Sequence, residues 1–530
     1  MRWGLATVLV LTCLMSATTG SASSHRDGGT LRVNVSLTQI STLDPAIDYE
    51  YYGGQLLYAT CLRLLNYSDR RGHVGQLVPE AASRWPTVSE DGLTYTFTVR
   101  SGYRFNTGEP VTAASFSRAL ERVLAKKSAS PGAQFYTDIV GAADTLAGTA
   151  RHPRGIVVSG NTIAFHLTAR SPTFPARLAM NFGCAQPVAL PLSTHGVDLP
   201  PMAGPYYIAA FDQGREIVLQ KNPNYHGPRA AHADRIVVTT GTSLDTSLLQ
   251  VRAGQADYDL GGLPPTSIET LVKKYGVNRG RFFVHNGLLL EYLALNTAHG
   301  PLRDVRLRKA VNYAIDRLAI ARLNGPYGGK PTDQVLVPGV PGYHNASLYP
   351  NHPDVARARA LVAGRHVSLI LYSGVGQPFE NQDQLIQRDL AAAGIQVQVR
   401  AVPFDQLLKL IGNTNTRYDM VDIGWGPDFI DPYDYIDLLL NGSRITTQNN
   451  VQWAQFDHPA FNKRMDTDAL LSGARRRAEY AKLDADLMRQ AAPLAPMYVS
   501  TVREFVSSRV GCYTFVPALQ AMSLAAACVR

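Results

Sequence analysis

The sequence predicts an α/β fold made of two or three sub-domains. Residues 367–423 alternate strand, helix, strand, helix and strand, an order that implies βαβ units with right-handed crossovers. The strands are expected at 367–372, 395–402 and 420–423, with helices at 379–393 and 404–411. A chain of 530 residues is too long for one hydrophobic core, so more than one sub-domain is expected.

A ligand site is expected after the last strand of this segment. Residues 417–435, RYDMVDIGWGPDFIDPYDY, alternate acids and aromatic residues just past the strand. A carboxylate with ring walls binds a ligand ammonium well, by a charge-assisted hydrogen bond and by the ring faces. Ligands of such sheets bind beyond the carboxyl ends of the strands. This rule places Ser373 and Gly374, after the first strand, beside Trp425 and Asp428.

The same stretch allows other interpretations. Asp431 before Pro432 is typical of a helix cap and first turn, so the stretch can be a turn that leads into a helix. Asp428 and Asp431 could also form the paired carboxylates of a glycosidase, although the sequence does not give their separation in space. We assign Asp431 mainly to capping and keep Asp428 as the candidate ligand contact.

The remaining elements are predicted by alternation and by capping residues. Strands are expected at 31–36, 93–100, 156–159, 162–167, 205–211, 216–220 and 235–239, and helices after Thr112 and at 244–253. Another strand ends at Asn296. Asp304 opens a further helix, whose apolar face holds Leu307, Val311, Ile315 and Leu318.

The N-terminus predicts export. An apolar stretch at 5–15 follows a basic residue and precedes small residues, the pattern of a secretory signal peptide. Cleavage after Ala22 fits a small-x-small site, with Ala17 as an alternative. The residues before Cys13 do not match a lipoprotein signal, so no lipid anchor is expected. Nothing after residue 30 has 18 uninterrupted apolar residues, and the mature protein is expected to be soluble.

Export leaves four cysteines: Cys61, Cys184, Cys512 and Cys528. An even number in an oxidising compartment indicates two disulfides, with three possible connectivities. Cys512 and Cys528 are near in sequence and are expected to pair, which leaves Cys61 for Cys184. Buried free thiols are the alternative.

Charge and motifs argue against several functions. The net charge of +9 is spread along the chain, and its densest cluster, Arg475 to Arg477, is expected to be a solvated helix face, so no nucleic-acid partner is expected. The 13 histidines form no HExxH and no paired metal-ligand spacing. GxSxG and Walker motifs are absent from the sequence. We therefore expect a protein without catalytic residues, metal or cofactor.

Eight phrases occur in one order along the chain. They are YATCLRLLNY, LVPEAASRWPTVSEDGLTYTFTVRSGYRFNTGEPVTAASFSRAL, AGPYYIAAFDQGREIVLQKNPNY, LALN, DVRLRKAVNYAIDR, DLAAAGIQVQV, IGWGPDFIDP and PLAPMY. Together they resemble the extracellular solute-binding proteins of family five, the dipeptide- and oligopeptide-binding components of ABC importers. The resemblance covers residues 31–529, and eight phrases in register are more specific than any one motif.

The resemblance implies a two-lobed, periplasmic-binding-protein-like fold of type II, with three sub-domains, a hinge and a ligand cleft between the lobes. After a signal peptide at 1–22, lobe one would comprise 30–56, 191–287 and 493–530, its extra sub-domain 57–190, and lobe two 288–492. Two crossings, near Leu288 and Ala492, would form the hinge.

The resemblance also implies the ligand contacts. In peptide binders of this family, the aspartate three residues after the Gly-Trp pair holds the peptide's α-ammonium, and this role would be that of Asp428 after Gly424 and Trp425. Arg400 and Arg417 are candidates by type for the peptide carboxylate. Backbone groups would pair with an extended peptide by strand addition near Ser36, Thr38 and Gln39 and at Asp422, Ile423 and Gly424.

The implied function is capture of a small solute, expected to be a short peptide, and its delivery to the permease subunits of an ABC importer. The protein would be a monomer in the periplasm or at the outer face of the cell membrane. Binders of nickel complexes, haem and sugars belong to the same family. A secreted hydrolase and a role in signalling or envelope assembly are the competing classes.

Overall fold

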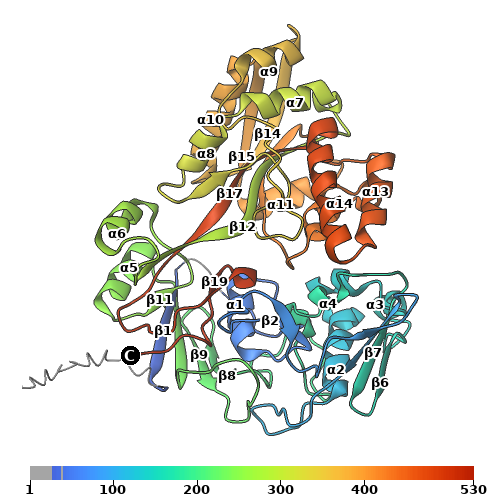
Figure 1. Cartoon of the computed structure of the whole chain (residues 1–530), viewed down its shortest axis with the longest axis vertical. Coiled ribbons are helices and arrows are strands. Elements are labelled where there is room, and N and C mark those ends of the chain that lie inside the picture. The colour runs from blue at the N-terminus through green and yellow to red at the C-terminus, as the bar shows by residue number, and fades with distance from the viewer. Residues whose placement is uncertain (1–26, 37–39) are drawn as a thin grey trace, which may run out of the picture.

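The computed structural model describes residues 27–36 and 40–530, and it shows two lobes, one above the other (Figure 1). The upper lobe is built on a six-stranded sheet, and the lower lobe holds a five-stranded and a four-stranded sheet. The predicted signal peptide at 1–22 and the predicted ligand contacts Thr38 and Gln39 lie outside the described residues. In the described part, no helix is both long and apolar enough to cross a membrane.

The six-stranded sheet contains the alternating segment and has the order β13-β17-β12-β16-β14-β15. β14 is parallel to β15 and β16, whereas β12 is antiparallel to β16 and β17. The strands are β12 (Phe282–Leu295), β13 (Gly329–Pro331), β14 (Val367–Gly374), β15 (Ile395–Val402), β16 (Met420–Trp425) and β17 (Leu494–Phe505). The helices of this lobe are α7 (Val305–Ala314), α8 (Arg317–Arg322), α9 (Val355–Val362), α10 (Phe379–Ala392), α11 (Phe404–Ile411), α12 (Ile436–Leu440), α13 (Pro459–Ala469) and α14 (Gly473–Asp486).

The predicted elements of the alternating segment are confirmed, and β15 and α11 have the predicted bounds. The helix predicted to run past Ile315 is divided into two. α7 ends at Ala314 because Ile315 has an extended backbone conformation. The Asp316 carboxylate then caps α8 by accepting a hydrogen bond from the Ala319 amide at 2.8 Å. Leu318 therefore belongs to the second helix.

The five-stranded sheet combines distant parts of the chain in the order β11-β1-β10-β9-β8. Its strands are β1 (Thr30–Val35), β8 (Tyr206–Asp212), β9 (Glu216–Lys221), β10 (Arg235–Thr240) and β11 (Tyr258–Asp259). The neighbouring helices are α1 (Tyr51–Thr60), α5 (Leu244–Ala253) and α6 (Ile268–Tyr275). Val506, Leu524 and Val529 belong to the core of this sheet, so the end of the chain returns to the lower lobe.

The four-stranded sheet has the order β4-β5-β7-β6 and its own core. Its strands are β4 (Thr87–Val88), β5 (Thr94–Thr98), β6 (Ile156–Ser159) and β7 (Thr162–His166), and its helices are α2 (Ala113–Leu124), α3 (Ala142–Ala147) and α4 (Phe174–Arg177). Two small ladders complete the lower lobe: β2 (Leu65–Tyr67) with β3 (Leu77–Pro79), and β18 (Phe515–Val516) with β19 (Ala521–Met522). The predicted hairpins are β6–β7 and β8–β9.

Two long antiparallel strands, β12 and β17, run between the lobes (Figure 1). Their lower ends, Phe282 and Phe505, pack in a small core with α5 and α6, whereas their upper ends lie in the core of the upper lobe. The pairing shifts register between Asn286 and Leu290, which marks an irregularity in the ladder where the strands pass from one core to the other.

Both predicted disulfides are present. Cys61 is bonded to Cys184, 123 residues away, and Cys512 to Cys528, 16 residues away. The first bond ties the end of α1 to a 3₁₀ helix at Asn181–Gly183. Both of these elements contribute residues to the cavity between the lobes, so the bond holds two of its walls together.

Candidate ligand-binding cavity

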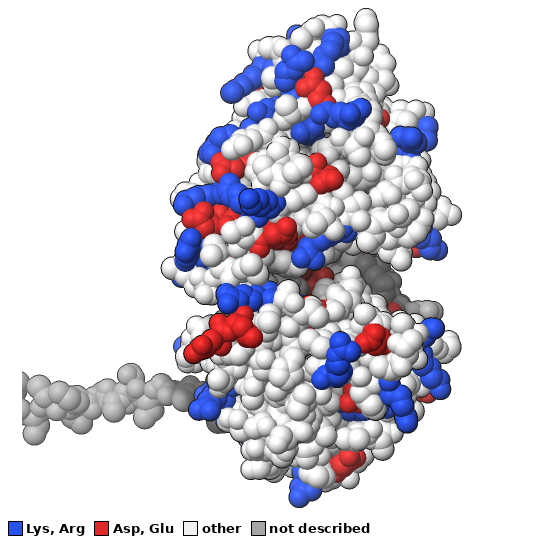
Figure 2. Space-filling view, turned by 90° about the vertical axis from the view of Figure 1, so that its right-hand side faces the viewer, with Lys and Arg blue, Asp and Glu red and all other residues white. Residues whose placement is uncertain are grey.

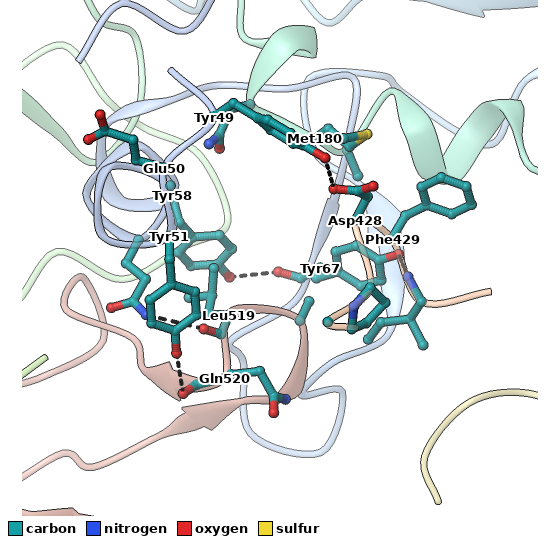
Figure 3. A pocket seen from close by; sticks show the side chains of 18 of the residues that line it. Tyr49, Glu50, Tyr51, Tyr58, Tyr67, Met180, Asp428, Phe429, Leu519 and Gln520 are labelled. Atoms are coloured by element: carbon teal, nitrogen blue, oxygen red, sulfur yellow. Dashed lines mark hydrogen bonds between the residues drawn. The ribbon is translucent and has the colours of Figure 1, made fainter. Parts of the chain in front are cut away.

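A cavity of about 480 Å³ lies between the lobes, at the groove that Figure 2 shows from the side. The lower lobe lines it with residues 48–58 before and within α1, with residues 63–67 and with residues 179–182. The upper side consists of residues 426–430 after β16 together with Leu289, Ser500 and Val502 of the two long strands. Residues 518–520 close the cavity near the C-terminus (Figure 3).

Asp428 is brought into this cavity by the loop that follows β16. Its carboxylate accepts a hydrogen bond from the Tyr49 hydroxyl at 2.5 Å, across the space between the lobes (Figure 3). The loop is held by the buried Asp434 carboxylate, which accepts from the Asp428 amide at 2.9 Å and from Trp425 Nε1 at 3.3 Å. The sequence spacing after the Gly-Trp pair thus places a carboxylate at the cavity wall.

The electrostatics of Asp428 and Asp434 favour a cationic ligand. Burial raises the pKa of Asp428 to about 6, although the Tyr49 hydrogen bond lowers it. Burial and the charge of Asp428 raise the pKa of Asp434 well above its usual range. Within residues 27–36 and 40–530, neither carboxylate forms an ion pair. A ligand ammonium would supply the opposite charge that these two acids lack.

Tyrosine rings form much of the remaining wall. Tyr49 and Tyr51 are 46% and 55% exposed, so their rings are free to contact a ligand. The Tyr58 hydroxyl donates to the Tyr67 carbonyl at 2.6 Å, and the Tyr51 hydroxyl donates to the Gln520 carbonyl at 3.2 Å (Figure 3). These bonds fix the rings around an open centre. Exposed ring faces beside a carboxylate suit an ammonium or guanidinium group.

The loop after β16 also touches the lower lobe. Phe429 is buried in the core of the four-stranded sheet, although its loop belongs to the upper sheet. The Ile430 amide donates to the Tyr67 hydroxyl at 3.1 Å. With the Tyr49–Asp428 bond, these contacts join the two lobes directly at the cavity.

The other predicted contacts that the structure describes are not on the cavity lining. Trp425 is half-buried and packs edge-on against Trp453, with ring centroids 6.1 Å apart. Gly424 lies beside the Glu291 carboxylate of β12, whose pKa burial raises to about 7. Ser373, Asp422 and Ile423 are buried in the upper lobe, and Asp422 accepts from the Gln382 amide at 2.7 Å. Asp428 is therefore the predicted side chain that the structure places on the lining.

The two arginines suggested for a peptide carboxylate lie elsewhere. Arg400 is exposed beside the Tyr372 hydroxyl, and Arg417 contacts His299 at 3.0 Å; neither lines the cavity. Arg63 lines it instead. The Arg63 side chain is buried and donates to Asn181 Oδ1 at 2.7 Å and to Asn66 Oδ1 at 3.3 Å. Arg63 was not predicted as a cavity residue, because a single arginine among apolar residues does not indicate a ligand contact in the sequence.

The expected solvated face at Arg475 to Arg477 needs a correction. Arg475 and Arg477 are exposed, but Arg476 is buried and pairs with the Asp431 carboxylate at 2.7 Å. Asp431 also accepts from the Tyr433 amide at 2.9 Å, which is the predicted capping role. Residue 476 faces inward because one turn of α14 packs against the loop after β16.

A lower-lobe segment, residues 48–51, contributes an acid or a tyrosine to the lining at each position. The sequence is rich in tyrosine here, but no ligand contact was predicted from it. The sequence feature that could have indicated a ligand contact is the alternation of acids with tyrosines, which resembles the pattern in the loop after β16. Its position opposite that loop depends on the fold.

The fold and the cavity define a two-lobed solute-binding protein. The family model of "Bacterial extracellular solute-binding proteins, family 5 Middle" matches residues 76–447, and the chain belongs to this family. The oligopeptide-binding protein OppA of Bacillus subtilis (strain 168) is 25% identical, over 94% of this chain and 94% of the relative. Heme-binding protein A of Haemophilus influenzae is 24% identical, over 83% and 82%.

A solved structure shows the same fold. Clavulanic acid biosynthesis oligopeptide binding protein 2 has a TM-score of 0.88 at 24% identity, and the match covers 95% of this chain and 96% of that one. The family is one of binding proteins, and the resemblance read from the eight phrases is confirmed.

Proposed function

We propose that this protein captures short peptides in the interlobe cavity and delivers them to the permease subunits of an ABC importer. The observation that carries the proposal is Asp428, a half-buried carboxylate on the cavity wall beside a second acid and among tyrosine rings. A peptide's α-ammonium matches this arrangement by charge and by hydrogen bonding. The relative named as an oligopeptide-binding protein supports a peptide as the ligand.

The proposal includes the division of the chain into lobes. Lobe one would comprise residues 30–56, 191–287 and 493–530, with an extra sub-domain at 57–190, and lobe two residues 288–492. The register shift in the β12–β17 ladder supports a hinge near Leu288, and Ala492, in a left-handed conformation at the start of the return strand, supports the second crossing. Export after cleavage of 1–22, without a lipid anchor, and action as a monomer complete the proposal.

Identification of the co-purifying ligand tests the function most directly. Protein secreted from its native host is analysed by native mass spectrometry, and the bound species are released and sequenced. Intact peptides of a few residues are the expected result. A bound haem, nickel complex or sugar would replace the peptide assignment with another solute, and release of cleaved peptides with turnover would replace binding with hydrolysis.

A transport assay tests the partner. Cells that lack this protein are expected to lose uptake of the identified peptide, and cells that lack the permease subunits are expected to show the same loss. Uptake that continues without this protein while binding in vitro is intact would contradict delivery to an importer.

A further inference from the structure

A second carboxylate, that of Asp48, lines the cavity and is not satisfied by the protein around it. Asp48 is 1% exposed and lies just before α1. Its Oδ2 accepts one long hydrogen bond, 3.3 Å from Asn181 Nδ2. Its Oδ1 is buried and has no hydrogen-bond partner among the described residues. A buried carboxylate oxygen without a partner is costly, so this arrangement calls for a group that the protein does not supply.

Asp44, in the same loop, shows how this protein satisfies a buried acid that is purely structural. The Arg122 guanidinium donates to both Asp44 oxygens, at 2.8 and 2.6 Å. The amides of Ala46 and Val197 add two more hydrogen bonds. Asp44 therefore has four donors and a counter-charge, and it does not line the cavity. Asp48, four residues later, lines the cavity with the long Asn181 hydrogen bond and the neighbouring Glu50 backbone amide, and it has no counter-charge.

The charged groups around Asp48 do not neutralise it. The nearest cation on the lining, Arg63, reaches it only through Asn181, whose amide accepts from Arg63 and donates to Asp48. Glu50 adds a like charge, and its own carboxylate is engaged by Ser41. Burial raises the pKa of Asp48 well above its usual range, and the Glu50 charge raises it further.

The fold reserves space for this carboxylate. Gly53 lies in the first turn of α1, directly against Asp48, and a Cβ at residue 53 would stand 2.0 Å from Asp48 Oδ1. Tyr49, the next residue after Asp48, extends across the cavity to Asp428 (Figure 3). The segment that holds Asp48 is thus linked to Asp428 by the side chain of the next residue, Tyr49.

We propose that Asp48 is a second cation-binding residue and that the preferred ligands are short peptides with a lysine or arginine side chain. Asp428 binds the α-ammonium and Asp48 binds the basic side chain, whose stem lies along the Tyr49 and Tyr51 rings. This inference rests on the proposed function, because it assigns a substrate class to the same cavity. The exposed ring faces contribute cation–π contact with the same side chain.

Calorimetry with matched tripeptides tests the inference. The probes are trialanine and its analogues with lysine, norleucine or glutamate at each position in turn. At one position the lysine peptide is expected to bind at least about 10-fold more tightly than the norleucine peptide, as for a charge-assisted hydrogen bond. The glutamate peptide is expected to bind most weakly.

Variants test whether the preference for lysine peptides depends on Asp48. In Asp48→Asn the lysine-to-norleucine ratio is expected to fall to about 1. Gly53→Ala displaces the carboxylate and is expected to reduce the same ratio. The control is Asp212→Asn, which removes an exposed acid in the β8–β9 hairpin and is expected to leave the ratio unchanged.

The outcomes separate this inference from the proposed function. Equal binding of lysine and norleucine peptides at every position would overturn the second subsite but leave peptide capture intact. A lysine preference that persists in Asp48→Asn would also overturn it, by assigning the preference elsewhere. Failure to bind any tripeptide would count against the proposed function itself. If Asp48→Asn does not fold, the wild-type peptide series together with Gly53→Ala decides the matter.

Discussion

The Asp428→Asn variant tests the centre of the cavity, because it keeps the shape of the side chain and removes its charge. A charged hydrogen bond contributes about 1.5–3 kcal/mol net, so peptide affinity at pH 7 should fall roughly 10- to 150-fold. The Asp428 pKa of about 6 gives a second expectation, that peptide affinity depends on pH. Binding of an ammonium favours the ionised carboxylate, and protons therefore compete with the peptide.

The sign and size of this competition follow from the pKa. At pH 7 about nine-tenths of Asp428 is ionised, and at pH 5 about one-tenth. Wild-type affinity should therefore be nearly full at pH 7, about twofold weaker at pH 6 and about 10-fold weaker at pH 5. A free peptide's α-ammonium stays protonated and its carboxylate stays ionised over this range. In Asp428→Asn the loss between pH 7 and pH 5 should largely disappear.

Calorimetry with trialanine at pH 5, 6 and 7, alongside thermal melts, provides the measurement. The difference between wild type and variant isolates Asp428 from other buried acids, such as Glu291, that titrate in the same range. An affinity change below about threefold with an unchanged melting temperature would refute the assignment of Asp428 to the ligand. A lowered melting temperature with unchanged affinity would make it a scaffold residue.

Three further variants have defined outcomes. Tyr49→Phe removes the hydroxyl that lowers the Asp428 pKa, so the affinity–pH midpoint in calorimetry should move upward; no movement would contradict the bond. Trp425→Ala should lower the free energy of unfolding by a few kcal/mol, by denaturant titration, with a smaller affinity loss than Asp428→Asn, because the ring lies behind the lining. Replacing Cys61 and Cys184 by serine should cost about 2–5 kcal/mol of stability, and an unchanged unfolding midpoint would contradict this.

Local patterns predicted the framework of the upper lobe well. Period-two alternation gave the bounds of β15, and the flanking glycines placed the end of β16 within two residues. The end of α7 before Ile315 was not predicted, because Leu307, Val311, Ile315 and Leu318 have the spacing of one continuous helix face. α7 ends where Asp316 caps the next helix, α8. An aspartate side chain can either continue a helix or cap a new one, and the spacing of apolar residues does not decide between the two.

Of the described lining residues, only one on the upper side was predicted, because a single wall has a local sequence signal whereas the pairing of two walls has none. The lower-lobe contacts predicted at Thr38 and Gln39 lie outside the described residues. Asp428 follows a strand, and a strand end is visible in the sequence. Its partner Tyr49 is 379 residues away in the chain, so the hydrogen bond between them is a property of how the lobes meet. β12 pairs with one edge of β16 along all of β16. The backbone contacts predicted at 422–424 would therefore have to form at the opposite edge of β16.

The contrast between Asp44 and Asp48 shows where sequence reasoning ends. Both are acids in one loop, four residues apart, and nothing local distinguishes them. Asp44 is neutralised because α2 brings Arg122, 78 residues later, against it. Asp48 receives no cation: the Cys61–Cys184 bond holds the Asn181 segment at the end of α1, and Arg63 donates to Asn181 Oδ1 while Asn181 Nδ2 donates to Asp48. The unpaired acid is therefore created by tertiary structure, and it faces the space a ligand would enter.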